Sequence, residues 1–420
     1  MAVKEKKLLA NTGWLLVLQA VNILLPFVTV PYVTRVFGAD LYGVFSIALN
    51  WIMYFQLVVE YGFNLSATKK VVEAESRTEY DLLVAAVVAA RLSLVVICFV
   101  VALVMAYVSA VSGGQLCCML VLFSMLIGIA LQLNWLFQGL QDMKMITVAT
   151  ASARFLSVVL IFLLINNQDQ LVLYAFLYSI TYLASGVLTH ILAWKRHQIR
   201  VRMPSLRMVL REMRDGTPIF LSSAAGKIIG NVGVTVLGAS QPAAAVGAYA
   251  AVLKIPQMVS LMFSPISQAL YPRVNEERLK SERLAIGLVA KFGIPVITLF
   301  AFILVAIVAL RDPLVCFLFG SDYLSATDAL IPLSIWVLLG IANNLLGVQL
   351  LIPFGYQKLY SRLMIIDALV ALALNLFLGP TFGVMGVASA IAISEAVLAA
   401  SLLVSLVFIV RKNKRLNKRD

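Results

Sequence analysis

Long stretches without a charged side chain constrain this chain more than any other feature of its sequence. Residues 8–34, 92–141 and 329–357 contain no Asp, Glu, Lys or Arg. About 20 consecutive apolar residues span the hydrocarbon core of a bilayer as a helix, so 92–141 predicts two spans joined by a tight turn. The chain is 62% hydrophobic and 13% charged, which lies outside the range of soluble domains. We therefore expect an all-α polytopic membrane protein.

Charged segments and clusters of Gly, Pro and Asn divide the chain into twelve apolar segments. The predicted spans are 11–35, 42–66, 82–108, 116–139, 145–166, 170–194, 217–238, 245–270, 285–310, 327–352, 359–379 and 384–410. FQGLQDMK before the fifth span is echoed by FGYQK before the eleventh, as expected for a transporter with internal repeats. We predict two six-helix lobes, residues 1–200 and 216–420, the second with a basic tail, joined by a basic cytoplasmic connector at 201–215.

Lys and Arg are distributed unevenly between the two predicted sides of the membrane. Of the 33 basic residues, 26 fall at the termini and loops of one side and two, Arg35 and Arg311, at the other. Cytoplasmic loops carry the excess of basic residues, so we predict that both termini are cytoplasmic. The net charge of +13 then reflects this orientation and attraction to anionic lipid, and we expect no nucleic-acid partner.

Five basic residues fall inside predicted spans, where a charge costs at least ~2.5 kcal/mol even on mild insertion scales. They are Arg91, Arg154, Lys227, Lys254 and Lys291. Too few acids lie nearby to neutralise them one by one. We therefore predict a cavity lined by these cations, which suits a phosphate or diphosphate group. Lys291 lies near the predicted cytoplasmic end of its span, so its side chain could instead extend to the membrane surface.

Acidic residues in the spans are candidates for coupling transport to an ion, because a bound proton or cation relieves the cost of a buried carboxylate. The candidates are the acids Asp367, Glu395 and Glu60, together with the neutral residue Asn375. Asn375 follows Asp367 by two helical turns and could add a neutral oxygen to the same face. Structural alternatives remain open: Asp367 or Glu395 could pair with Lys227 or Lys291, and Glu60 could cap a helix or pair with Lys69.

Prolines occur inside predicted spans, at Pro26, Pro31 and Pro265. A proline removes a helical hydrogen bond, and carbonyls freed at membrane depth persist only where protein or cavity water satisfies them. We predict that these prolines bend helices and serve gating in a transporter that rocks two lobes. Proline kinks also occur in static bundles, so the prolines alone do not decide between the two.

The sequence indicates neither a catalytic module nor a bound cofactor. The four cysteines lack metal-site spacing, the phosphate-binding motif GxxxxGK[ST] does not occur, and the predicted loops are short. We therefore predict a protein that is not an enzyme and that holds neither a metal nor a cofactor. Active transport would then depend on H+ or Na+ or on the membrane potential.

Several stretches resemble one family of transporters. They are NILLPFVTVPYVTRVFGADLYGVF (22–45), VEYGFNLSATKKV (59–71), WLFQGLQDMK (135–144), SPISQALYPRV (264–274) and GVASAIAISEAV (386–397). This set resembles the Wzx-type O-antigen flippases, in the polysaccharide-transport branch of the multidrug/oligosaccharidyl-lipid/polysaccharide (MOP) exporter superfamily, over nearly the whole chain.

The resemblance implies a MATE-like fold of two lobes and a flippase that works by alternating access. Its cargo would be an undecaprenyl-diphosphate-linked oligosaccharide, such as an O-antigen repeat unit, carried across the bacterial inner membrane. Its partners would be the lipid bilayer, this glycan, the polysaccharide polymerase and the chain-length regulator. The diphosphate of such a cargo agrees with the cationic interior.

Two other functions remain open at this stage. A drug/cation antiporter of the same superfamily shares the fold, but its cavity favours acidic and aromatic groups, whereas basic residues outnumber acids in the present spans. A membrane-embedded polysaccharide polymerase or glycosyltransferase would be expected to carry a sizeable outer loop with catalytic Arg, Asp or His, and the predicted outer loops are short.

Overall fold

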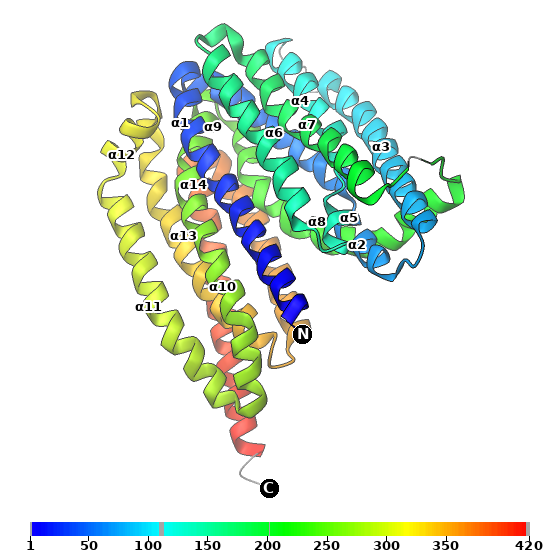
Figure 1. Ribbon diagram of the computed structural model, residues 1–420. Helices are drawn as coiled ribbons and strands as arrows, with labels where there is room; N and C mark the ends of the chain where they lie inside the picture. The colour runs from blue at the N-terminus through cyan, green and yellow to red at the C-terminus, as the bar shows by residue number, and fades with distance from the viewer. Residues whose placement is uncertain (1, 109–112, 201, 417–420) are drawn as a thin grey trace. The chain divides into compact units, whose positions relative to one another are not determined.

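The computed structural model describes residues 2–108, 113–200 and 202–416, without the side chains of 2–10, 222–229 and 411–416. These residues form helices joined by short connections, and no strand occurs among them. The helices labelled in Figure 1, with three short helical segments (η1 to η3), are α1 (Ala2–Glu60), α2 (Phe63–Glu73), α3 (Arg77–Val108), α4 (Gly113–Leu131), α5 (Asn134–Gly139), α6 (Met143–Leu164), η1 (Gln168–Gln170), α7 (Leu171–His197), α8 (Leu206–Ser240), α9 (Ala243–Val252), α10 (Lys254–Lys280), α11 (Glu282–Ala309), α12 (Arg311–Leu318), η2 (Ser321–Ala329), α13 (Leu330–Asn343), the π-helix η3 (Asn344–Leu351) and α14 (Gln357–Leu416).

Nine helical segments of the described chain are long and apolar enough to cross a membrane. Two of them, Asn11–Glu73 with 63 residues and Gln357–Val410 with 54, are far longer than one span of about 20 residues. Each contains a glycine with a non-helical backbone, Gly38 (φ 68°) and Gly383 (φ 57°). With one span on either side of each glycine, and with α8 added, the segments match the predicted count of twelve. The all-α polytopic fold class is confirmed.

The reversal between the first two spans occurs at a glycine and not at the prolines before it. Within α1, non-helical dihedral angles occur at Gly38, whereas the backbone remains helical through Pro26 and Pro31. Similarly, α10 continues through Pro265. A positive φ favours a residue without a Cβ atom. Gly38, the first residue of GADLYG, therefore makes the turn between the first two spans.

Contacts between Cα atoms divide the chain into two compact units, Met1–Asn231 (unit 1) and Val232–Asp420 (unit 2). The boundary falls inside α8, beyond the predicted connector at 201–215. The first part of α8 therefore belongs with α1 to α7, and its last nine residues belong with the second half of the chain.

Ionic and aromatic contacts attach the first part of α8 to the rest of unit 1. The Lys70 ammonium lies 2.7 Å from a Glu212 carboxylate oxygen and 2.6 Å from one of Asp215. This hydrogen bond from Lys70 holds the pKa of the exposed Asp215 carboxyl below its ordinary value. Nearby, the rings of Tyr61 and Phe220 stack with centroids 4.7 Å apart. The start of α8 is thus held to the junction between α1 and α2.

Small residues allow the central helices of unit 1 to approach closely. The helices α4 and α7 pack along most of their length, and α1, α3 and α6 pack around them. A Cβ atom added at Gly186 of α7 would lie 2.7 Å from the carbonyl oxygen of Gly128 in α4. In membranes such glycine crossings bring two backbones into van der Waals contact, so this pair fixes the centre of the unit.

Unit 2 is built around helices α10, α11, α13 and α14, with η3 continuing α13. Its buried core includes Phe263, Leu304, Val337 and Leu402 from these four helices. The ring of Phe263 meets that of Phe300 edge to face, with centroids 6.0 Å apart, an arrangement that aromatic rings prefer. The polar residues of the unit lie beside this apolar core and are described below.

Candidate functional site

Arg91 on α3 is fully buried in unit 1, where it closes a break between two helices. Helix α4 ends at Leu131 and α5 begins at Asn134, so carbonyl groups near the end of α4 lack helical partners. The Arg91 guanidinium donates to the carbonyl oxygens of Gln132 at 3.0 Å and Ile129 at 3.4 Å. The bond to Gln132 satisfies a carbonyl that could not remain bare inside a membrane, and the bond to Ile129 adds to the one that its carbonyl accepts from the Gln132 N–H at 3.2 Å.

The other side of the Arg91 guanidinium is also occupied. It donates to the Asn64 side-chain oxygen at 2.9 Å and lies 5.8 Å from the centroid of the Phe63 ring, within cation–π range. Arg91 is only 2% exposed. The prediction that Arg91 lines an open cavity is therefore not retained, because its side chain is used to hold α2, α3 and the α4–α5 break together.

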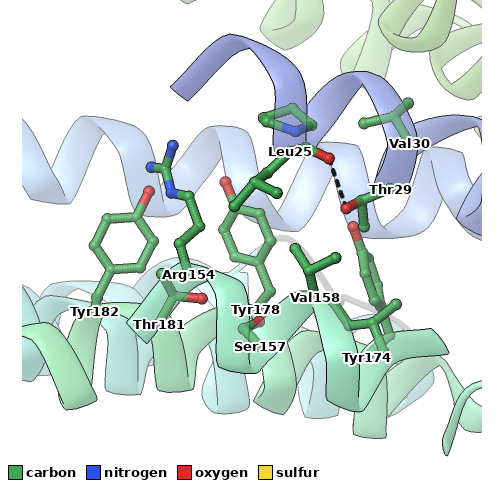
Figure 2. Close-up of a pocket in the computed structure, with 12 residues that line it drawn as sticks. Leu25, Thr29, Val30, Arg154, Ser157, Val158, Tyr174, Tyr178, Thr181 and Tyr182 are labelled. Atoms are coloured by element: carbon green, nitrogen blue, oxygen red, sulfur yellow. Dashed lines mark hydrogen bonds between the residues drawn. The ribbon is translucent and has the colours of Figure 1, made fainter. Parts of the chain in front are cut away.

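Arg154 on α6 has a different setting, since it lines a pocket of about 110 Å³ within unit 1. The pocket lies between α6, α7 and the proline-containing part of α1, which supplies Pro26 and Thr29 to its wall. Figure 2 shows the Arg154 side chain extending from α6 toward α1, beside Tyr178 and Tyr182. Arg154 donates to the Asn22 side-chain oxygen at 2.6 Å. That partner is neutral, and no ion pair to Arg154 occurs among the described residues.

Three tyrosines form a ladder on the pocket side of α7. Tyr174, Tyr178 and Tyr182 follow one another at four-residue intervals and all line the pocket. Ring centroids are 6.3 Å apart for the first pair and 6.0 Å for the second. In Figure 2 the hydroxyl groups of Tyr178 and Tyr182 point in the same direction as Arg154. The pocket thus presents one guanidinium, hydroxyl groups and aromatic faces together.

The remaining predicted cations lie apart from this pocket. Lys254 begins α10 at its break from α9 and is half-buried; no hydrogen bond or ion pair to it occurs in the described part of the chain. Lys291 is exposed on α11, which agrees with the alternative that it extends to the membrane surface. The side chain of Lys227 in α8 lies outside the described residues.

Two predicted acids meet in unit 2, on the two halves of α14. Glu395 accepts a hydrogen bond from the Asn343 side-chain amide at 2.8 Å, and the same amide also donates to the Glu395 carbonyl at 3.0 Å. Asp367 lies near Ser394, whose hydroxyl donates to the Ile391 carbonyl at 3.0 Å, and it interacts electrostatically with Glu395. One carboxylate oxygen of Asp367 is buried without a partner.

The acid pair has no basic partner in the described chain. Neither Asp367 nor Glu395 forms an ion pair there, so the alternative in which Lys291 neutralises one of them is not observed. The close neighbours of the pair are neutral: the amide of Asn343 and the hydroxyl of Ser394. Two nearby carboxylates with neutral neighbours favour the uptake of a proton or a cation.

The other two coupling candidates lie in different surroundings. Asn375 is fully buried and donates to the Ala371 carbonyl at 2.8 Å, while its side-chain oxygen has no hydrogen-bond partner. That oxygen faces Gly233 of α8, and a Cβ added there would lie 3.6 Å from it. Glu60 ends α1 in unit 1 and accepts a bond from Gln56 at 2.8 Å. The expected grouping of Asn375 with Asp367 is therefore not seen as a contact.

Reasoning from the sequence missed the neutral residues that hold these charges. Asn22, Asn64 and Asn343 are unremarkable in the sequence, because an asparagine in a span indicates no particular partner. The tyrosine ladder had a usable signal: LYAFLYSITY places three tyrosines on one helical face. Rows of aromatic residues on a helix are more often part of a core. Only the adjacent Arg154 indicates that these tyrosines line a binding pocket.

Comparison with known proteins gives consistent matches over most of the chain. The family described as "Polysaccharide biosynthesis protein" matches residues 8–277. A protein of Escherichia coli (strain K12) named "Putative O-antigen transporter" is 27% identical over 409 residues, covering 97% of each chain. One of the same name from Shigella dysenteriae is 27% identical, covering 94% of this chain and 98% of its own.

Two solved structures share the fold. The inward closed conformation of the lipid II flippase MurJ has a TM-score of 0.75 at 11% identity, covering 95% of this chain and 87% of MurJ. An inward-facing multidrug resistance MATE family transporter of the MOP superfamily has a TM-score of 0.60 at 16% identity, covering 93% and 98%. The predicted two-lobe MOP fold is confirmed.

Substitution of Arg91 by Met is expected to destabilise the protein. The variant would leave the Gln132 carbonyl without its donor, at about 1–3 kcal/mol for a buried group, and would also remove the bonds to Ile129 and Asn64. We expect a lower temperature of thermal unfolding and a lower yield of purified protein. The exposed Arg77 at the start of the same helix provides the control variant Arg77→Met, which should unfold near the wild-type temperature. Wild-type unfolding of Arg91→Met would contradict the structural role.

Proposed function

This chain belongs to the polysaccharide biosynthesis protein family, and on that premise we propose that it is a flippase for a lipid-linked oligosaccharide. The cargo we propose is an undecaprenyl-diphosphate-linked repeat unit of O-antigen or a related surface polysaccharide. The relatives named as O-antigen transporters and the fold shared with a lipid II flippase support this choice.

One observation carries the proposal: the Arg154 pocket offers an un-neutralised cation within a membrane-spanning unit. A guanidinium held by a neutral amide (Asn22 at 2.6 Å) keeps its full charge and its remaining donors. Its planar donors match phosphate oxygens in pairs. We therefore assign the diphosphate of the cargo to Arg154, with Lys254 as a second candidate cation in unit 2.

The tyrosine ladder suits the sugar part of the same cargo. A tyrosine presents an apolar face and a polar hydroxyl, and a sugar ring presents apolar faces and polar edges. Tyr178 and Tyr182 lie beside Arg154 in the pocket, so a sugar next to a bound diphosphate would meet these rings. Pro26, which forms part of the pocket wall, is then placed where bending of α1 would alter the site.

We also propose that the acid pair in unit 2 couples transport to an ion. Asp367 and Glu395 interact with each other and have neutral neighbours. A proton or Na+ bound there during one part of an alternating-access cycle would remove the repulsion between the carboxylates. Ion entry on one side of the bacterial inner membrane could then drive the return of the empty carrier.

Replacing Arg154 by Gln is expected to lower glycan export by about ten- to a hundredfold. The estimate follows from the loss of charge-assisted hydrogen bonds, worth about 1.5–3 kcal/mol. Export is measured as surface polysaccharide in cells that lack their own transporter. Arg154→Lys keeps the charge without the planar donors and should retain an intermediate level.

The matched control is Lys144→Gln, at the start of the same helix. The Lys144 ammonium lies 5.6 Å from the centroid of the Trp14 ring, and Lys144 does not line the pocket. Its variant should export at the wild-type level, and thermal unfolding should show that all three variants are folded. Full export by a folded Arg154→Gln protein would reject Arg154 as the diphosphate ligand.

Amide substitutions in the acid pair are expected to uncouple transport from its ion gradient. Asp367→Asn and Glu395→Gln remove the titratable group and preserve shape, so cargo binding should remain while the response to an imposed pH or Na+ gradient is lost. The assay is cargo transport in proteoliposomes, with the exposed Glu276→Gln variant as control. Unchanged gradient dependence in both pair variants would reject the coupling role.

The proposed orientation, with both termini cytoplasmic, is tested with reporter fusions. A reporter enzyme that folds only outside the cytoplasm should be active when fused after residues in the turns of one side: Gln168, Ser240 and Ser321. It should be inactive after residues in the turns of the other side: Glu75, Gln198 and Ser281. Two or more reversed results would overturn the orientation deduced from the basic residues.

A further inference from the structure

A second cavity lies in unit 2 and has the shape and composition of a lipid site. It measures about 330 Å³ and is bounded by α10, α11 and Leu345 of η3. Its lining is apolar except for one residue: Phe263, Ile266, Ala269, Leu270, Phe292 and Val296 surround it with Gly293, and Arg273 is the charged member. This apolar groove belongs neither to the Arg154 pocket nor to the acid pair.

The groove is open along the outside of the helices that form it. Ile266 is 37% exposed and Phe292 42% exposed, whereas Phe263 and Leu270 behind them are buried. In a chain that crosses a membrane, such half-exposed apolar side chains face hydrocarbon and not water. The natural content of the groove is therefore a hydrocarbon chain.

Arg273 gives the groove a polar end at a defined depth. It lies seven residues before Lys280, the last residue of α10, or about 10 Å from the end that we predict to be cytoplasmic. Phe263 lies ten residues further into the helix, about 15 Å deeper. The groove thus extends through about half of a hydrocarbon core of ~30 Å, the thickness of one leaflet.

Arg273 is also free to bind an anion. Its side chain is exposed, and no hydrogen bond or ion pair to it occurs within the described ranges of the chain. Basic groups between membrane helices on the cytoplasmic side bind the head groups of anionic lipids. A guanidinium at the mouth of a hydrocarbon groove matches a phosphate joined to a chain.

We propose that this groove holds an anionic phospholipid of the cytoplasmic leaflet, with one acyl chain along α10 and α11 and its phosphate on Arg273. The length of one leaflet favours an acyl chain over a much longer polyprenyl chain. The site is a resident lipid site that stabilises unit 2, so it is independent of the cargo assigned to the Arg154 pocket and would survive failure of the proposed function.

The test measures binding of phosphatidylglycerol and of phosphatidylcholine to the purified full-length protein by native mass spectrometry. We expect a preference for phosphatidylglycerol and a rise in unfolding temperature when it is added. Arg273→Gln should weaken phosphatidylglycerol binding by roughly fivefold, the loss expected for one basic side chain at an anionic lipid. Arg273→Lys should retain most of it. Ala269→Trp fills the groove and keeps the charge of Arg273, so this variant should lose phosphatidylglycerol binding altogether.

The matched control is Arg278→Gln, which removes the same charge from α10 at a position that does not line the groove. It should bind phosphatidylglycerol as the wild type does. Equal losses in Arg273→Gln and Arg278→Gln would show a general effect of surface charge and overturn the site. Displacement of phosphatidylglycerol by undecaprenyl phosphate at equal concentration would assign the groove to the cargo lipid and overturn it as well. If Ala269→Trp does not fold, the three arginine variants decide.

Discussion

Every polar backbone group of this chain that lies at membrane depth must find a partner within the protein or in cavity water, because the hydrocarbon core of a membrane offers none. Helices satisfy the requirement by themselves, and the fold can depart from them only where another residue completes the bonding. The break between α4 and α5 is such a place: Arg91 donates to the carbonyls of Ile129 and Gln132, and the Asn64 side chain holds the guanidinium in position. The packing of α2 and α3 at that break depends on this single buried side chain.

The same requirement distinguishes Arg91 from Arg154 by the hydrogen bonds that their guanidinium groups already form within the protein. One nitrogen of the Arg91 guanidinium donates to two backbone carbonyls and another donates to Asn64, and the side chain is only 2% exposed, so it is closed to a ligand. Arg154 has one neutral partner, Asn22, and faces a pocket of tyrosines. Both are arginines in the middle of a span, and the cost of placing each there is similar. The difference lies in what offsets that cost: backbone carbonyls near a helix end for Arg91 and, in our proposal, a bound phosphate for Arg154.

The sequence predicted the features that depend on composition and spacing. Twelve spans and two halves follow from apolar runs and glycine-bearing turns, whereas the MOP fold was implied by the family resemblance. The breaks at Gly38 and Gly383 fall close to where those runs divide. The roles of Arg91 and Arg154 could not be separated, because their partners are distant in sequence. Asn375 was expected beside Asp367 from helical spacing, yet it faces Gly233 of another helix. Helical periodicity predicts which face of a helix a residue occupies. It does not predict which other helix packs against that face.

The proposed anion site and the proposed ion-coupling site lie in separate units. Coupling between them would have to pass through the chain that joins the units. An anion site in unit 1 and an acid pair in unit 2 can influence each other only if some element responds to both, because coupling requires a shared change in state. The chain passes from one unit to the other within α8. Its start is held to α2 by Lys70 with Glu212 and Asp215, and its last part lies against α14 at Gly233 and Asn375. A continuous helix transmits a displacement that a flexible linker would absorb, so the proposed coupling makes α8 the element whose movement both sites would have to share.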